Sequence, residues 1–288
     1  MAKRVVICGG TGFIGHALYK LLDEAGYEVV IVTRNPKPGQ YSWDQLPQAI
    51  EGSCAVVNLA GHNIACKFTP ENKRLILSSR IESAKNISAA IAQCTIKPEK
   101  WINASATGFY GDRGDETLNE SSPAGTGFLA ETCIAWENAC FSDKSETKKT
   151  VIRIGVVLAN GQGVLRTLVP LAKAFLGGAA GNGNQWVPWI HIQDIARLIH
   201  FAIDHGTPAI LSGSSPNPVQ NKDFMAWLRR INHRPWSPNV PTPVMKLIGD
   251  VIGPDASLVL TSCRIISTQP ADFQFKYPTL KSISATNL

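Results

Sequence analysis

The first half of the chain alternates short apolar runs with longer segments of helical periodicity. Apolar residues 5–8 enter a glycine-rich turn, after which Leu18, Leu21 and Leu22 recur on one helix face. Further strands are predicted at 28–33, 41–44, 55–61, 100–104 and 150–158, the one at 41–44 short and ending in a turn. Helices are predicted at 70–93 and 128–140. This alternation is typical of an α/β protein with a doubly wound parallel sheet and helices on both faces.

The pattern becomes less regular after about residue 160. Glycine and proline are frequent there, and the predicted helices are separate, at 195–205, 222–231 and 244–252. We therefore expect a sheet domain over 1–160, to which a segment at about 190–212 returns. The remainder of 161–288 is expected to form a smaller C-terminal cap, the usual place for substrate selection.

The turn after the first strand has the spacing of a dinucleotide-binding loop. Its glycines follow the pattern G-x-x-G-x-x-G between a buried strand and a helix. Glycine permits the tight turn, leaves room for a phosphate at the main chain, and lets the helix lie close to the strand. The helix N-terminus then offers free N–H groups to a diphosphate. The predicted contacts are Gly9, Gly10, Thr11, Gly12, Phe13, Ile14 and Gly15.

Thr33 and Arg34 follow the second predicted strand, where an NAD-specific site usually carries an acidic residue. A guanidinium is a good bidentate partner for the 2′-phosphate of NADP. The sequence therefore favours NADP over NAD, with a solvated loop charge as the alternative interpretation of Arg34.

Small residues end the third predicted strand, as is typical where a backbone passes beneath a flat cofactor. The carboxyl ends of parallel strands meet at one crevice, so this segment and Ser105 are expected to contact the same ligand. The residues of the segment are Asn58, Leu59, Ala60 and Gly61.

Composition narrows the class of protein. Of 288 residues, 44% are hydrophobic and 17% charged, which suits a folded globular chain. The net charge of +6 is scattered, so we expect no nucleic-acid partner, and no apolar run is long enough for a membrane span. The seven cysteines form no C-x-x-C pair and no cluster with histidine. These features predict a small-molecule substrate, no metal site and a cytoplasmic, reducing location.

Two motifs, Gly9–Gly15 and Trp189–Ala196, resemble the extended short-chain dehydrogenase/reductase superfamily, in its NAD-dependent epimerase/dehydratase group. Further stretches resemble an atypical branch, the "epimerase family", whose members are often labelled cell-division-inhibitor homologues. They lie at 58–61, 79–81, 105–111, 128–131, 136–137, 153–158 and 273–280. The resemblance covers nearly the whole chain and implies a Rossmann-type fold with a nicotinamide dinucleotide cofactor.

The resemblance also implies a catalytic pair that this chain lacks. In the wider superfamily a Tyr-x-x-x-Lys pair supplies the acid and base, but matching the helix through 136–137 places Leu129 and Cys133 at those positions. Neither residue can do that work. Tyr110 and Ser105 are the candidate catalytic replacements. The alternatives are that Tyr110 packs as a structural aromatic and that Ser105 satisfies the turn's backbone.

Each of the other candidate polar residues has a functional interpretation and a structural or solvent-exposed one. His62 lies near the expected nicotinamide, but a loop histidine is more often exposed. Lys67 and Arg80 could bind an anionic substrate, or simply form a solvated face. Glu131 and Glu137 fall on different faces of one helix, so neither is assigned as a base. His191 is expected to be structural.

The leading interpretation is an NADP(H)-dependent oxidoreductase of the atypical short-chain type, acting on an unidentified small carbonyl or hydroxyl compound. A sugar-nucleotide epimerase or dehydratase is an alternative that the missing pair weakens. A non-catalytic NADP(H)-binding redox sensor is the third hypothesis. By analogy with the superfamily, the chain is expected to be a monomer or a homodimer that pairs through the helices at 70–93 and 128–140.

Overall fold

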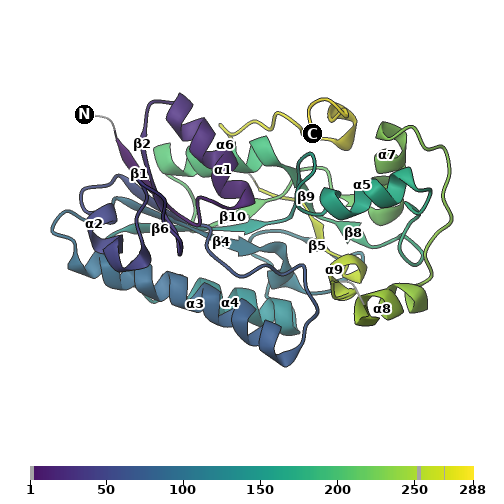
Figure 1. Ribbon diagram of the computed structural model, residues 1–288, viewed down its shortest axis with the longest axis horizontal. Coiled ribbons are helices and arrows are strands. Elements are labelled where there is room, and N and C mark those ends of the chain that lie inside the picture. The colour runs from purple at the N-terminus through teal and green to yellow at the C-terminus, as the bar shows by residue number, and fades with distance from the viewer. Residues whose placement is uncertain (1–2, 252–253, 269) are drawn as a thin grey trace.

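A six-stranded parallel sheet forms the centre of the protein, in a computed structural model that describes residues 3–251, 254–268 and 270–288 (Figure 1). Its order is β10-β6-β4-β3-β1-β2. The strands are β1 (Arg4–Cys8), β2 (Glu28–Val32), β3 (Ala55–Asn58), β4 (Lys100–Ala106), β6 (Lys148–Ile154) and β10 (Ile210–Gly213). The predicted doubly wound α/β class is confirmed.

Helices cover both faces of this sheet (Figure 1). On one face lie α1 (Phe13–Glu24) and α6 (Ile192–Asp204), and on the other lie α3 (Pro70–Gln93) and α4 (Phe128–Phe141), with the short α2 (Leu46–Ile50) beside α3. Because water is excluded from both sides, the inner strands are mostly apolar; all four residues of β3 are buried.

The strand order reverses between β1 and β3, since β2 pairs with one edge of β1 and β3 with the other. In parallel sheets a ligand crevice opens at the carboxyl ends of the strands at such a reversal. The short strand predicted at 41–44 is wrong beyond its first residue: Tyr41 makes a single bridge to Val32, and Trp43–Gln45 forms a 3-10 helix. The reason is local, because the side chain of Gln45 accepts from the Ser42 N–H and starts that helix.

The single strand predicted at 150–158 is also wrong, because Gly155 divides it. β6 ends at Ile154, and β7 (Val156–Leu158) leaves the sheet to pair with β9 (Trp189–His191). At Gly155 the backbone touches the next segment so closely that a Cβ would lie 2.5 Å from the carbonyl oxygen of Pro188. That oxygen accepts a 2.7 Å hydrogen bond from Val156 N–H.

Apart from α6 and β10, most of the second half of the chain forms a group of short elements at one end of the sheet (Figure 1). Its helices are α5 (Leu165–Lys173), α7 (Asn221–Ile231), α8 (Thr242–Val251) and α9 (Ser257–Leu260), with a 3-10 helix, η3, at Leu280–Ser282. Two small sheets pair β8 (Trp186–Val187) with β11 (Val219–Gln220), and β5 (Thr117–Leu118) with β12 (Arg264–Ile265). The helix predicted at 195–205 starts earlier, at Ile192, and Ile252 of the predicted 244–252 helix lies outside the described residues.

The C-terminal segment joins the group of short elements to the sheet. Phe273 belongs to the hydrophobic core of the sheet, whereas Tyr277 and Leu280 belong to a second hydrophobic core among the short elements. The fully buried carboxylate of Asp194, in the first turn of α6, accepts 2.8 Å hydrogen bonds from the main-chain N–H groups of Lys276 and Tyr277. The division of the chain at about residue 160 stays a prediction.

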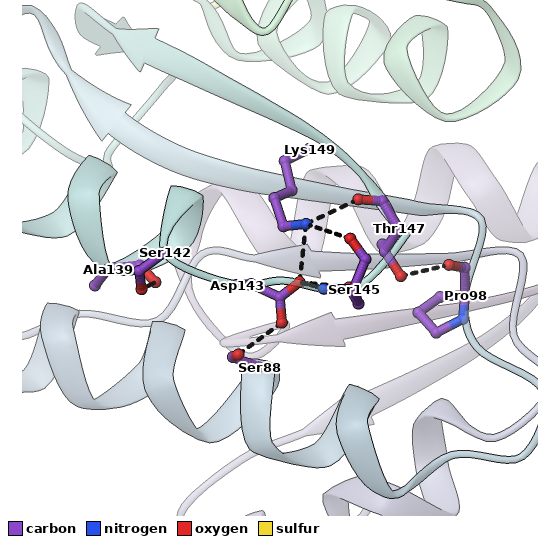
Figure 2. Close-up of polar contacts among 8 residues, drawn as sticks. All are labelled: Ser88, Pro98, Ala139, Ser142, Asp143, Ser145, Thr147 and Lys149. Carbon is purple, nitrogen blue, oxygen red and sulfur yellow. Dashed lines mark hydrogen bonds and ion pairs between the residues drawn. The ribbon is translucent and has the colours of Figure 1, made fainter.

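A buried polar cluster holds the amino-terminal ends of β4 and β6 (Figure 2). Asp143 forms a 2.8 Å ion pair with Lys149, and the two side chains are only 4% and 11% exposed. The Ser88 hydroxyl of α3 donates to Asp143 at 2.6 Å, and Thr147 donates to the Pro98 carbonyl at 2.9 Å. The cluster therefore joins α3, α4 and β6 at the end of the sheet opposite the glycine-rich turn.

Candidate functional site

The glycine-rich turn after β1 packs against the end of β3. Gly9 has φ +84°, and a Cβ there would lie 2.9 Å from the main-chain nitrogen of Ala60. A Cβ on Gly15 would lie 2.6 Å from both Gly9 O and Gly10 Cα, so α1 rests directly on the turn. No side chain caps the first N–H groups of α1. The turn is therefore a main-chain cradle of the kind that binds anionic groups.

This turn forms one wall of a pocket of about 460 Å³. The structure brings three predicted segments together there, one after each of β1, β2 and β3. The predicted residues that line the pocket are Gly9, Thr11, Gly12, Thr33, Arg34, Leu59, Ala60 and Gly61.

Other predicted residues lie behind the pocket wall. Asn58 is fully buried, donates to Asn103 Oδ1 at 2.8 Å and to Ser83 Oγ at 3.1 Å, and accepts from Ala60 N–H at 3.2 Å. It thus fixes the end of β3 instead of facing the pocket. Four predicted residues of the glycine-rich turn do not line the pocket and instead support the shape of the turn. They are Gly10, Phe13, Ile14 and Gly15.

Arg34 is exposed at the rim of the pocket, in a loop that Tyr41 holds in place. Thr33 N–H donates to Tyr41 O, and Tyr41 N–H donates to Ile31 O, each at 2.9 Å. Within the described parts of the chain, no carboxylate forms an ion pair with Arg34. The guanidinium is therefore available to a ligand.

Helix α3 provides a wall of the pocket that the sequence did not predict. The residues of this wall recur at helical spacing along one face of the helix, and Trp43 lines the pocket too. The helix residues are Leu75, Ser78, Ser79, Glu82, Ser83 and Asn86. The signal in the sequence was a stripe of small and polar side chains at i, i+4, i+8 within a long helix, where an apolar stripe would be expected for packing.

The two candidate catalytic residues, Ser105 and Tyr110, meet in one buried network. The Ser105 hydroxyl donates to Glu137 Oε1 at 2.7 Å, and Arg153 holds the same carboxylate through bonds of 3.0 Å from Nε and 2.9 Å from Nη2. Arg153 Nη1 also donates to the Tyr110 hydroxyl at 3.0 Å, and its guanidinium lies 3.4 Å from the ring centroid of Phe109. β4, α4 and β6 are joined through these side chains.

Burial limits what this network can do. Ser105 is 3% exposed and Tyr110 is fully buried at the end of the 3-10 helix η2 (Thr107–Tyr110). Burial raises the pKa of the Tyr110 phenol although Arg153 opposes the change, so the phenol stays protonated at neutral pH. Neither residue lines the described pocket. Their catalytic roles therefore stay predictions.

Leu129 and Cys133 of α4 occupy the two positions where the wider superfamily has the Tyr-x-x-x-Lys pair. Both side chains pack against Gly108 of η2. Burial raises the pKa of the Cys133 thiol to about 11, so it carries no charge at neutral pH. The guanidinium of Arg80, on α3, lies close by over the ring of Trp136.

Two further residues have clear positions. His62 lines the pocket just after Gly61. His191 is 1% exposed, accepts from Gln193 N–H at the start of α6, and contacts Asn287 O at 2.9 Å through Nε2, as expected of a structural residue.

In the part of the chain that the structure describes, no group of three or more His, Cys, Asp or Glu side chains could hold a metal, and no helix is long and apolar enough to cross a bilayer.

Comparisons with known proteins agree with this geometry. Residues 5–211 match the model of the "NAD dependent epimerase/dehydratase family". An Arabidopsis thaliana protein, "Epimerase family protein SDR39U1 homolog, chloroplastic", is 31% identical over 296 residues, with 96% of this chain and 84% of the relative covered.

Two solved structures are also similar over nearly the whole chain. Human epimerase family protein SDR39U1 (isoform 2), crystallised with NADPH, has a TM-score of 0.89 at 30% identity, with 97% of each chain covered. A protein from Corynebacterium glutamicum described as a nucleoside-diphosphate sugar epimerase has a TM-score of 0.78 at 32% identity, with 98% of this chain and 57% of that chain covered.

Proposed function

Because the chain belongs to the NAD dependent epimerase/dehydratase family, we propose that it is an NADP(H)-dependent oxidoreductase that acts on a small carbonyl or hydroxyl compound. The single observation that carries this proposal is the pocket that joins the Gly9–Gly12 turn to Arg34. A bound nicotinamide cofactor would supply or accept the hydride there.

The residues present fit an NADP(H) molecule. A side chain at Gly9 or Gly15 would collide with backbone, so the turn keeps its main chain open toward the pocket. Arg34 offers an unpaired cation beyond β2, which suits a 2′-phosphate. The crystal structure of the human relative with NADPH supports the same choice of cofactor.

The chain's own side chains would orient the reacting compound. Ala60 and Gly61 are small residues that line the pocket at the end of β3, and Ser105 is proposed to hydrogen-bond the substrate oxygen. Glu137 and Arg153 would position the Ser105 hydroxyl. Because Ser105 is only 3% exposed and Tyr110 is fully buried, their proposed parts as hydrogen-bond donor and proton donor need a movement of η2 or the loop after it.

A sugar-nucleotide epimerase or dehydratase is the second candidate, favoured by the description of the Corynebacterium structure. The redox-sensor hypothesis draws on Leu129 and Cys133, which leave no acid–base pair on α4. Oligomeric state and cytoplasmic location stay predictions, and the Arabidopsis relative is described as chloroplastic.

The test is to measure NADPH binding by fluorescence and then NADPH oxidation with a panel of aldehydes and ketones. Turnover of at least one compound, reduced in Ser105→Ala, is the expected result. Sugar nucleotides turned over without net change in NADPH would support the epimerase. Tight NADPH binding with no turnover of either substrate class would support the sensor.

A further inference from the structure

Four large apolar side chains are exposed on two neighbouring segments, the end of α5 and the loop after α7. Trp236 is 66% exposed and Leu176 56%, and Phe175 and Leu171 are exposed as well. The two helices pack together (Figure 1), and the Ser237 hydroxyl donates to Phe175 O at 2.7 Å. Single exposed apolar residues are ordinary, but a group of them marks a contact site. The four residues together form the α5–α7 patch.

The backbone holds the ring of Phe175 in its exposed position. Phe175 has φ +61°, in the left-handed region that a bulky side chain rarely adopts. Its N–H donates to Ala172 O at 3.1 Å, and the Arg234 guanidinium lies 4.9 Å from the centroid of its ring. Such a conformation persists only where the surrounding contacts impose it, and residues of this kind cluster at functional sites.

Positive charge accompanies the patch, and no negative charge on the same segments offsets it. Residues 165–178 and 229–239 contain no aspartate or glutamate. Among the described residues, no carboxylate forms an ion pair with any of the five cations on these segments. The five are Arg166, Lys173, Arg229, Arg230 and Arg234.

Two of these cations are fixed in direction by main-chain oxygens. Arg234 Nε donates to Lys173 O at 2.9 Å, and Arg229 Nη1 donates to Gly177 O at 2.8 Å. A side chain that is already held in place loses little freedom when a partner binds. A guanidinium can then pair with a carboxylate through two parallel hydrogen bonds.

Charge and composition decide which occupant the α5–α7 patch fits. A second copy of this chain in a two-fold interface would bring the same cations face to face, which is unfavourable. A lipid surface requires no fixed side-chain geometry, whereas Arg229, Arg234 and Phe175 are each held by the main chain around them. Tryptophan and arginine are the residues that most often contribute the binding energy of protein–protein contacts.

We propose that the α5–α7 patch binds an acidic, amphipathic segment of another protein. The apolar side chains of that segment would cover Phe175 and Trp236, and its carboxylates would pair with Arg230 and Arg234. No residue of the patch is among those that line the nucleotide pocket, so the segment and NADP(H) can be bound together. The proposal goes beyond the proposed function and does not depend on it.

Peptide selection tests the chemistry of the partner. Random linear peptides displayed on phage are selected on the full-length protein in the presence of NADPH, which occupies the glycine-rich turn. We expect enrichment of peptides that combine Asp or Glu with Leu, Ile, Phe or Trp. The most enriched peptide and a copy with every acid replaced by its amide are then titrated by calorimetry. The acidic peptide should bind at least about 10-fold more tightly, and added NaCl should weaken it because salt screens exposed charges.

Variants with matched controls assign the binding to the patch. Trp236→Ala should weaken the acidic peptide at least about 10-fold, as expected at the centre of a contact. Ile96→Ala removes another exposed apolar side chain, between α3 and β4, and should have no effect. Arg230→Glu reverses an exposed charge and should also weaken the peptide, whereas Lys20→Glu makes the same change on α1 and should not. NADPH affinity should be unaltered in all four variants.

Phe175→Asn separates contact with the partner from support of the fold. Asparagine tolerates the left-handed region better than phenylalanine, so the variant should be at least as stable to urea as the unmodified protein. Its affinity for the acidic peptide should nevertheless fall about 10-fold, because the exposed ring is gone. Unchanged peptide affinity in this variant would contradict the assigned contact.

The other possible occupants are outcomes of the same series. Selection that enriches no acidic peptide overturns the inference, and so do acidic peptides that bind Trp236→Ala and Arg230→Glu as tightly as the unmodified protein. Co-sedimentation with phosphatidylglycerol vesicles in place of peptide binding, lost in Trp236→Ala, would make the patch a lipid contact and overturn it. A dimer that Trp236→Ala dissociates would do the same by making it a contact between two copies. Absence of NADPH binding would contradict only the proposed function, because the patch variants locate the peptide independently of the pocket.

Discussion

Ser105 on β4 and Glu137 on α4 are joined by a 2.7 Å hydrogen bond at the carboxyl end of the sheet. Arg153, on the neighbouring strand, donates hydrogen bonds to both carboxylate oxygens of Glu137. The Arg153 side chain is only 5% exposed and the Glu137 side chain 6%. A buried pair of this kind is costly to break, because the remaining charge has no partner.

Removing one member of the pair should therefore destabilise the protein strongly. Arg153→Met is expected to lower the free energy of unfolding by about 3–5 kcal/mol, since it leaves the Glu137 carboxylate buried and alone. Urea denaturation measures the change. The control is Arg74→Met, which breaks an exposed pair with Glu71 and should cost at most about 1 kcal/mol. Similar losses for both variants would contradict the structural role of the buried pair.

Tyr110→Phe separates the two roles considered for Tyr110. The substitution removes the acceptor of a buried 3.0 Å bond from Arg153, so we expect a loss of about 1–3 kcal/mol in unfolding free energy. If Tyr110 packs only as a structural aromatic, as its full burial favours, kcat on any substrate found should fall by less than about 10-fold. A fall of 100-fold or more with little change in stability would establish Tyr110 as the proton donor.

Arg34→Ala should discriminate between the two nicotinamide cofactors. If Arg34 contacts the 2′-phosphate, the NADPH dissociation constant rises about 10- to 100-fold while that of NADH barely changes. Fluorescence titration of both cofactors measures this. Lys37→Ala, in the same exposed loop, is the control and should leave both affinities unaltered. Equal weakening of NADPH and NADH would remove the 2′-phosphate assignment.

The sequence could predict the elements that local pattern determines. β3 and α3 are predicted well because one is a continuous apolar run and the other begins with Thr69 as N-cap and a proline in its first turn. The break at Gly155 could not be predicted, because it depends on Pro188, which is distant in the chain.

The candidate functional site, too, could be predicted only where local sequence determines it. The turn at Gly9–Gly15 carries its own signature, so its place in the pocket wall was foreseeable. The burial of Tyr110 results from how η2 packs against α4. It is not encoded in any short stretch of sequence.

The Asp143 cluster predicts a specific dependence of stability on pH (Figure 2). Burial alone raises the pKa of this carboxyl, but hydrogen bonds from Lys149, Ser145 and Ser88 outweigh it and lower the pKa from 3.8 to about 2. A folded-state pKa below the unfolded one stabilises the protein above about pH 4, and this contribution is lost as the pH falls through 2. It is worth about 2 kcal/mol.

Asp143→Asn tests this directly. The variant should be less stable at neutral pH, and the difference from the unmodified protein should shrink between pH 4 and pH 2, because protonation removes the same charge. Denaturant melts at several pH values measure the difference. A constant difference over that range would show that Asp143 does not titrate as the structure indicates.

Gly15→Ala should damage the nucleotide cradle without touching any charged group. The new methyl group would lie 2.6 Å from the backbone of both Gly9 and Gly10, so the turn or α1 must move. Such overpacking costs about 1–3 kcal/mol in unfolding free energy. NADPH affinity should fall at least about 10-fold, because the main-chain N–H groups no longer converge on one anion. Gly206→Ala is the matched control: no atom lies within 4 Å of its Cβ, and both stability and NADPH affinity should stay unchanged. Normal NADPH binding by a folded Gly15→Ala variant would show that the diphosphate does not rest on this turn.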